Sequence, residues 1–115
     1  RGQLRQGEVI YWRYLDYEPP QSRRIGEIFA EASGYTLEET PFASGFAGYK
    51  DWFIESFDRP GYTIEVGQGV SPLPLSQFDE IYADNLGILV LGLALAGQPE
   101  LEPAEEPVSP FSPAR

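Results

Sequence analysis

The stretch Gly48–Gly67, GYKDWFIESFDRPGYTIEVG, constrains the fold most strongly, because it sets a helix-like run, a turn and a strand one after another. Residues 49–57 are predicted to form a short helix that directs Trp52, Phe53 and Ile54 inward. The sequence Asp-Arg-Pro-Gly at 58–61 is typical of a turn. Residues 62–66 then alternate in polarity, which predicts a strand with one carboxylate, Glu65, near its centre.

The residues before this stretch predict a strand, a helix and a weaker strand. Residues 8–15, EVIYWRYL, are β-branched and aromatic, and both faces are largely apolar, as in a strand that is covered on both sides. Residues 21–33 carry an apolar stripe at helical spacing, and Gly34 is placed to end that helix. Residues 35–40 are a weak candidate for a strand at the edge of a sheet.

A second, longer helix is predicted at residues 76–96. Ser76 and Asp79 have the spacing of a capping box, and Gly87 and Gly92 would allow close packing on the sheet. The apolar positions predict a buried helix: Leu75, Phe78, Ile81, Tyr82, Leu86, Leu89 and Leu93. The apolar run at 86–97 is shorter than the roughly 20 residues of a membrane span, so we expect a core helix in a soluble protein.

Charge and composition exclude several classes of partner. The 115 residues include 18 acidic and 8 basic side chains, a net charge of −10, which disfavours binding to nucleic acid or to an anionic membrane. The chain has no Cys and no His, so any metal would need carboxylates alone or ligands from another chain. We divide the chain into an α/β region at residues 1–97 and a Pro/Glu-rich tail at residues 98–115.

Two segments have alternative interpretations from the residues alone. The Gly-rich loop at 41–48, PFASGFAG, could bring backbone close to a ligand or could be an ordinary connector. Glu65 could be catalytic, or it could share with Thr63 the solvent face of a half-buried strand.

Four motifs give the chain a family resemblance. GEVIYW at 7–12, GYKDWF at 48–53, YTIEVG at 62–67 and PLPLSQFDEIY at 72–82 resemble, in order and spacing, the C-terminal part of zinc carboxypeptidases. The bacterial branch that cleaves γ-D-glutamyl–diamino-acid bonds in cell-wall peptides looks closest, and the resemblance covers most of residues 3–96. It implies a partial zinc-carboxypeptidase-like sheet with flanking helices, a truncated α/β/α sandwich.

The resemblance also implies roles for three residues. Glu65 matches the carboxylate that activates the zinc-bound water and then protonates the leaving amine. Lys50 matches a position in the specificity pocket, where a cation would favour a substrate with an extra carboxylate. The alternative for Lys50 is an exposed lysine at a helix end. The family's substrate-capping tyrosine would fall near Phe42, where this chain has none, and Tyr49 is the candidate substitute.

The zinc ligands of the family are absent from this sequence. The upstream His-x-x-Glu pair belongs to a region that the chain lacks, and Leu4, which cannot bind zinc, occupies the third ligand position. We therefore expect this chain to hold no cofactor, although the family uses zinc. We also expect the chain alone to be inactive. A truncated sheet should leave an exposed edge and an uncovered apolar surface, which predicts a homo-oligomer. The alternative function is a non-catalytic module that binds peptides, including cell-wall peptides, or mediates association.

Overall fold

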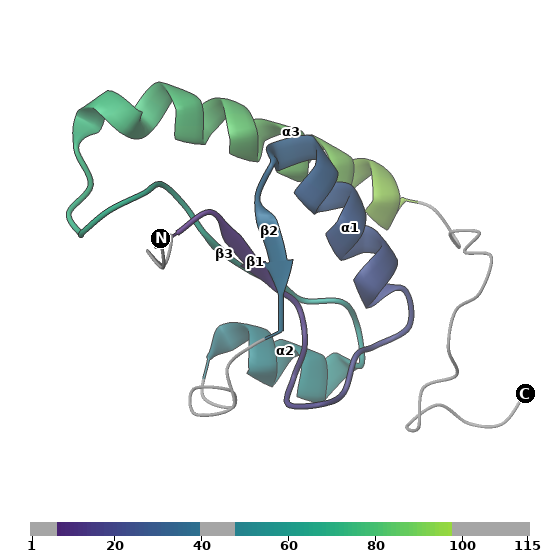
Figure 1. The fold of residues 1–115 in the computed structure, drawn as a ribbon. Coiled ribbons are helices and arrows are strands. Elements are labelled where there is room, and N and C mark those ends of the chain that lie inside the picture. The colour runs from purple at the N-terminus through teal and green to yellow at the C-terminus, as the bar shows by residue number, and fades with distance from the viewer. Residues whose placement is uncertain (1–6, 40–47, 98–115) are drawn as a thin grey trace, which may run out of the picture.

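The computed structural model describes residues 7–39 and 48–97 (Figure 1). In chain order the elements are β1 (Val9–Tyr11), α1 (Ser22–Ser33), β2 (Thr36–Glu38), α2 (Tyr49–Phe57), β3 (Thr63–Glu65), a short 3-10 helix (Leu75–Gln77) and α3 (Phe78–Ala96). The described part is a small α/β domain, which confirms the predicted fold class. The predictions for residues 1–6, for the loop at 41–47 and for the tail at 98–115 lie outside the described residues.

The three strands form one mixed sheet in the order β2-β1-β3. β1 is parallel to β2, with α1 as the crossover between them, and antiparallel to β3. The predicted edge strand is thus confirmed as β2. β1 is shorter than the predicted strand at 8–15, because its pairing ends at Tyr11, opposite the terminal residues of β2 and β3. Further on, the backbone turns sharply at Leu15, whose φ is 54°. Two backbone hydrogen bonds between Tyr14 and Tyr17 close this turn.

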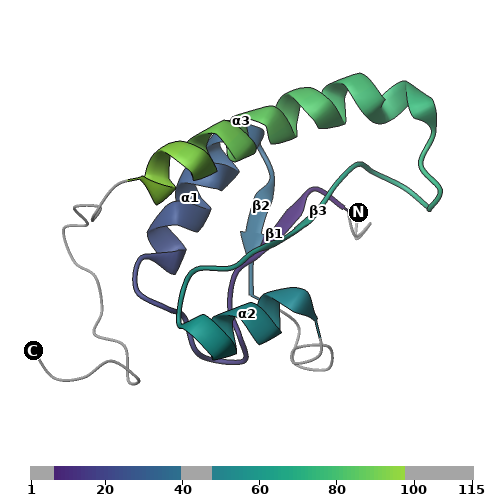
Figure 2. The same cartoon turned by 180° about the vertical axis from the view of Figure 1, so that it is seen from behind.

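The core lies on one face of the sheet, beneath α1 and α3. Ile10 of β1, Phe29 of α1, Tyr35 and Ile88 of α3 form its buried centre. Figures 1 and 2 show α1 and α3 packed against each other, with α2 at the far end of the sheet. The opposite face is more open than the apolar pattern of β1 predicts, since the outer strands place exposed side chains there: Thr36, Glu38, Thr63 and Glu65.

The prediction that the second long helix is buried is wrong for most of its length. Only Ile88 of α3 is fully buried, while Leu89 and Leu93 are 64% and 79% exposed. From Leu86 to Ala96 the helix is apolar all round, and α1 covers only one side of it, so a buried stripe could not be chosen there from the sequence. The exposed apolar face of α3, as we call it, consists of Phe78, Tyr82, Leu86, Leu89, Val90 and Leu93. The expectation of an uncovered apolar surface is therefore confirmed.

Three finer predictions about the helices also need correction. The capping box does not form, because α3 begins after the 3-10 helix and its N-cap residue, Gln77, makes no side-chain cap bond. Gly87 and Gly92 face α1 rather than the sheet: a Cβ on Gly92 would lie 3.6 Å from the Phe29 ring. On α2, whose bounds were predicted correctly, Ile54 points inward but Trp52 is half exposed.

Among the described residues, we find no helix with the length and apolarity needed to cross a membrane.

Candidate functional site

Glu65 lies on an open edge of the sheet. It is the last residue of β3, it pairs with Val9 of β1, and its side chain is exposed. The neighbouring Tyr11 is on the same face, because it lies two residues from Val9. Desolvation by burial raises the pKa of the Tyr11 hydroxyl, and the negative charges of Glu65 and Glu38 raise it further. Glu65 thus sits on the solvent face of a half-buried strand, and its catalytic role stays a prediction.

Lys50 has a quite different environment from the one expected of an exposed lysine at a helix end. It is only 4% exposed, although it is the second residue of α2. Its ammonium group donates hydrogen bonds to the Arg13 carbonyl oxygen and to Asp51 Oδ1, each 2.5 Å long. The alternative of a solvated lysine is therefore wrong. The charge is already neutralised inside the protein, where it joins α2 to the segment that follows β1.

Tyr49 is adjacent to Lys50 in sequence but faces solvent. It is 77% exposed, and its ring contacts those of Trp52 and Phe53, with centroid distances of 5.2 and 6.4 Å. Phe57 extends this exposed aromatic surface along α2. The buried Lys50 ammonium and the exposed Tyr49 ring therefore do not face a common space, and their substrate-binding roles stay predictions.

The described residues do not fit a zinc ion. No three His, Cys, Asp or Glu side chains lie close enough within residues 7–39 and 48–97 to hold a metal. The complete sequence has neither His nor Cys, so its only ionisable oxygen donors for zinc would be carboxylates and tyrosine hydroxyls. Leu4, the residue at the predicted ligand position, lies outside the described residues.

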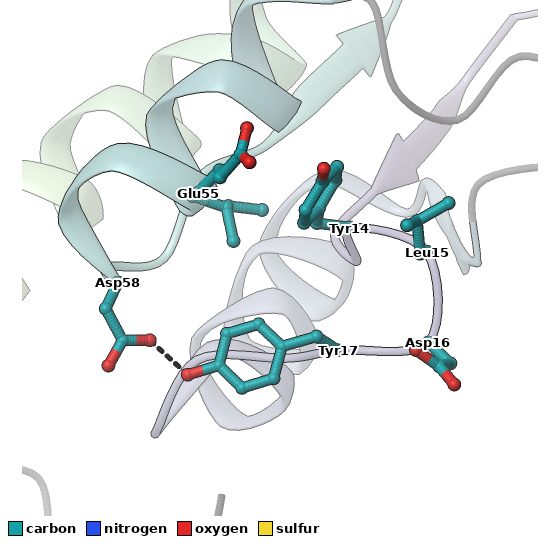
Figure 3. Close-up of a pocket in the computed structure, with 7 residues that line it drawn as sticks. Tyr14, Leu15, Asp16, Tyr17, Glu55 and Asp58 are labelled. Carbon is teal, nitrogen blue, oxygen red and sulfur yellow. Dashed lines mark hydrogen bonds between the residues drawn. The ribbon is translucent and has the colours of Figure 1, made fainter. Parts of the chain in front are cut away.

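A cavity of about 400 Å³ lies between the turn after β1 and the end of α2. Its lining consists of Tyr14, Leu15, Asp16, Tyr17, Ile54, Glu55 and Asp58 (Figure 3). The Tyr17 hydroxyl donates a hydrogen bond to Asp58 Oδ1, which ties the two segments together across the cavity. Neither Glu65, Lys50 nor Tyr49 lines it.

The sequence did not predict this cavity, because its lining residues fall in separate predicted elements. Tyr14 and Leu15 end the predicted strand at 8–15, Ile54 and Glu55 belong to the predicted helix at 49–57, and Asp58 begins the predicted turn. The available signal was the composition of these two segments, since each carries acidic side chains next to aromatic ones: YLDYE at 14–18 and ESFD at 55–58. That signal became a site only when the fold brought the segments together.

Two known proteins are similar to this chain over most of its length. The sequence is 51% identical over 90 residues, 78% of the chain, to gamma-D-glutamyl-L-diamino acid endopeptidase 1 of Lysinibacillus sphaericus. It is 43% identical over 84 residues, 73% of the chain, to the uncharacterized protein YqgT of Bacillus subtilis strain 168. Each match spans only 22% of the relative's own length. No family model matches the chain, and no solved structure matches it.

Fold and sequence together define a small α/β domain that is related in sequence to a peptidase. Its similarity to the Lysinibacillus endopeptidase extends along about a fifth of that protein's length.

Proposed function

We propose that this chain is a zinc carboxypeptidase-related polypeptide in which Glu65 occupies the position of the general acid and base. The reaction of such enzymes is hydrolysis of a peptide bond next to a C-terminal or diamino-acid residue. The observation that carries the proposal is the 51% identity over 90 residues to an endopeptidase named for γ-D-glutamyl-L-diamino acid bonds. The exposure of Glu65 supports it, because a general base must be reachable by substrate and water.

We further propose that the chain alone does not hydrolyse peptides. Zinc enzymes of this kind hold the metal with three protein ligands that include His, and this sequence has no His. The side chains around Glu65 do not replace them, since the described residues contain no group of carboxylates able to hold a metal. We therefore assign no hydrolytic step to this chain by itself.

The first experiment measures zinc content and turnover of the purified chain. Dialysis against zinc followed by metal analysis should give well under one zinc per chain, and a γ-D-glutamyl-diaminopimelate peptide should remain intact. Stoichiometric zinc, or turnover that a chelator abolishes, would show that the proposed inactivity is wrong.

A chimera tests the assignment of Glu65. The matching segment of the Lysinibacillus endopeptidase is replaced by residues from this chain, either with Leu4 or with Leu4→His. We expect only the Leu4→His chimera to hydrolyse the peptide, because it restores the third metal ligand. In that chimera Glu65→Gln should lower kcat by about 100-fold or more, the scale of general acid–base catalysis. Glu38→Gln, an exposed glutamate on the same face of the sheet, is the matched control.

If Glu65→Gln behaves like Glu38→Gln in an active chimera, the assignment of Glu65 is refuted. An inactive Leu4→His chimera that folds and binds zinc would refute the carboxypeptidase-like correspondence itself.

The exposed apolar face of α3 favours a second function, association with other chains. Such a continuous apolar surface is typical of an interface rather than of a solvated helix. We propose that the chain forms a homo-oligomer through this face. Size-exclusion chromatography with light scattering should give a mass above 12.8 kDa at micromolar concentration. A monomer at every concentration up to about 100 µM would eliminate this proposal. The dissociation constant would then exceed about 100 µM, which corresponds to a binding free energy weaker than about −5.5 kcal/mol.

We propose that a non-catalytic peptide-binding role would use Tyr49, since Lys50 is buried and already paired with Asp51. Calorimetry with diaminopimelate-containing peptides should detect binding that Tyr49→Ala weakens, because the Tyr49 ring is the accessible member of the pair. An affinity equal to that of the unmodified chain would remove Tyr49 from the proposal.

A further inference from the structure

The cavity between the turn at Tyr14–Tyr17 and the end of α2 has the properties of a separate binding site. Its volume of about 400 Å³ is within the range of small-molecule pockets, roughly 300–1,000 Å³. None of the residues with a proposed catalytic or substrate role lines it, so the inference does not depend on the proposed function.

The cavity has an apolar and aromatic floor. Ile54 and Tyr17 are both buried there, and Leu15 and Tyr14 extend the surface toward solvent. Leu15 adopts a left-handed backbone conformation, which is uncommon for a non-glycine residue and fixes its side chain at the tip of the turn. An alkyl chain placed on this floor would be removed from water.

The rim of the cavity is negatively charged. Three exposed acidic residues are among those that line it: Asp16, Glu55 and Asp58 (Figure 3). The Tyr17 hydroxyl holds the Asp58 carboxylate in place by a hydrogen bond. The C-terminus of α2 also lies here, and the partial negative charge of its last carbonyl groups adds to the same field.

The positive charges nearest in sequence do not fill the cavity. The Arg13 guanidinium lies 2.7 Å from Glu39 Oε1 and donates a hydrogen bond to the Asp16 carbonyl oxygen, but it is not a lining residue. Arg59, which follows Asp58, does not line the cavity either, and the last turn of α2 has no basic residue.

The spacing of the carboxylates decides which cation fits. They do not form a group that could hold a metal ion, as is true throughout the described residues. A cavity that combines an apolar floor, two tyrosine rings and separated carboxylates instead suits an organic cation with an alkyl stem. We propose that the cavity binds a primary alkylammonium group, such as a lysine side chain of a peptide. The stem lies on Leu15 and Ile54, and the ammonium group lies among the rim carboxylates.

The test is an NMR titration of the full ¹⁵N-labelled chain with N-acetyl-L-lysine methylamide. Backbone signals of residues 14–17 and 54–58 should shift and saturate with a Kd of about 1 mM, as expected for one small group bound at a solvent-exposed rim. N-acetyl-L-norleucine methylamide has a similar stem without the charge, and it should bind at least about five-fold more weakly. Raising the salt to 1 M should weaken lysine binding, because the Debye length falls to about 3 Å, but not norleucine binding.

Charge-removing variants locate the site. Glu55→Gln and Asp58→Asn should each weaken lysine binding by about two- to five-fold, the usual effect of one exposed ion pair. Asn at position 58 tolerates the left-handed conformation and still accepts the hydrogen bond from Tyr17. Glu80→Gln, an exposed glutamate in the first turn of α3, removes the same charge elsewhere and should leave the affinity unchanged.

Equal affinity for the lysine and norleucine compounds, or the absence of saturable shifts at residues 14–17 and 54–58, would overturn the proposal. The same holds if Glu80→Gln weakens binding as much as Glu55→Gln does. Should a variant fail to fold, the comparison of the two compounds and the salt series on the unmodified chain still decide the question.

Discussion

Lys50→Met is the most informative substitution, because Lys50 is a buried cation at a position that the family resemblance assigns to a specificity pocket. The Lys50 and Asp51 side chains are 3% and 5% exposed, and they form a direct ion pair. The Lys50 ammonium also binds the Arg13 carbonyl oxygen, so it links α2 to the segment after β1. Methionine matches the length of the lysine stem but carries no charge and donates no hydrogen bond.

The expected loss of stability follows from leaving Asp51 charged and buried. Removal of one partner of a buried ion pair costs about 3–5 kcal/mol, a large part of the roughly 5–15 kcal/mol that holds a typical domain together. A double variant that also carries Asp51→Asn removes the uncompensated charge. The asparagine keeps an oxygen that can accept the hydrogen bond from the Gly48 amide, as Asp51 Oδ2 does. The double variant should therefore recover about 2–3 kcal/mol relative to Lys50→Met.

The assay is urea unfolding followed by circular dichroism and by the fluorescence of the two tryptophans, analysed as free energies of unfolding. Glu55→Gln, an exposed position on the same helix, serves as the control and should change the free energy by less than about 0.5 kcal/mol. A cost below about 1 kcal/mol for Lys50→Met would refute the reasoning, because it would mean that Lys50 does not act as a buried structural cation. Additive effects in the double variant would refute it as well.

Three further predictions concern other parts of the fold. Gly67→Ala should lower the free energy of unfolding by about 1–3 kcal/mol, measured by urea unfolding, since φ is +75° there and the new Cβ would lie 2.3 Å from Leu73 Cδ1. Burial raises the pKa of the Tyr62 hydroxyl, which donates a 2.8 Å hydrogen bond to the Ser22 carbonyl oxygen, so the neutral form is favoured in the folded state. The neutral hydroxyl stabilises the folded state fully below the unfolded pKa of about 10, and this stabilisation is lost as pH rises further. Tyr62→Phe should therefore make the fall of stability at alkaline pH less steep. The same substitution should cost about 1 kcal/mol of unfolding free energy at pH 7. Leu93→Lys should change the monomer's stability by less than about 0.5 kcal/mol, but should lower the oligomer mass measured by light scattering if the exposed apolar face is the interface.

Local sequence patterns predicted most of the elements. The bounds of α2, 49–57, follow directly from a helical run between Gly48 and the turn at 58–61. The end of α1 at Gly34, where φ is 79°, reflects a residue that adopts the left-handed conformation without penalty. The strand at 35–40 was likewise predicted, as a candidate for an edge, and the structure places β2 at the edge of the sheet with two of its three residues exposed.

The site could not be predicted to the same degree, because it depends on contacts between distant segments. Whether Lys50 is solvated or buried depends on Arg13, 37 residues earlier, whose carbonyl oxygen accepts its hydrogen bond. The cavity depends in the same way on Tyr17 and Asp58, which are 41 residues apart. Neither pair leaves a periodic signal in the sequence.

The sequence by itself determined the α/β class, the positions of the helices and strands, and the absence of His and Cys ligands for zinc. Hydrophobic periodicity, turn residues and composition are local properties, so they can be read without the fold. The tertiary structure decided that Lys50 is buried, that α3 exposes most of its apolar surface, and that an acidic cavity faces solvent beside α2. These features arise because burial depends on which element packs opposite a side chain, and no local pattern specifies that partner.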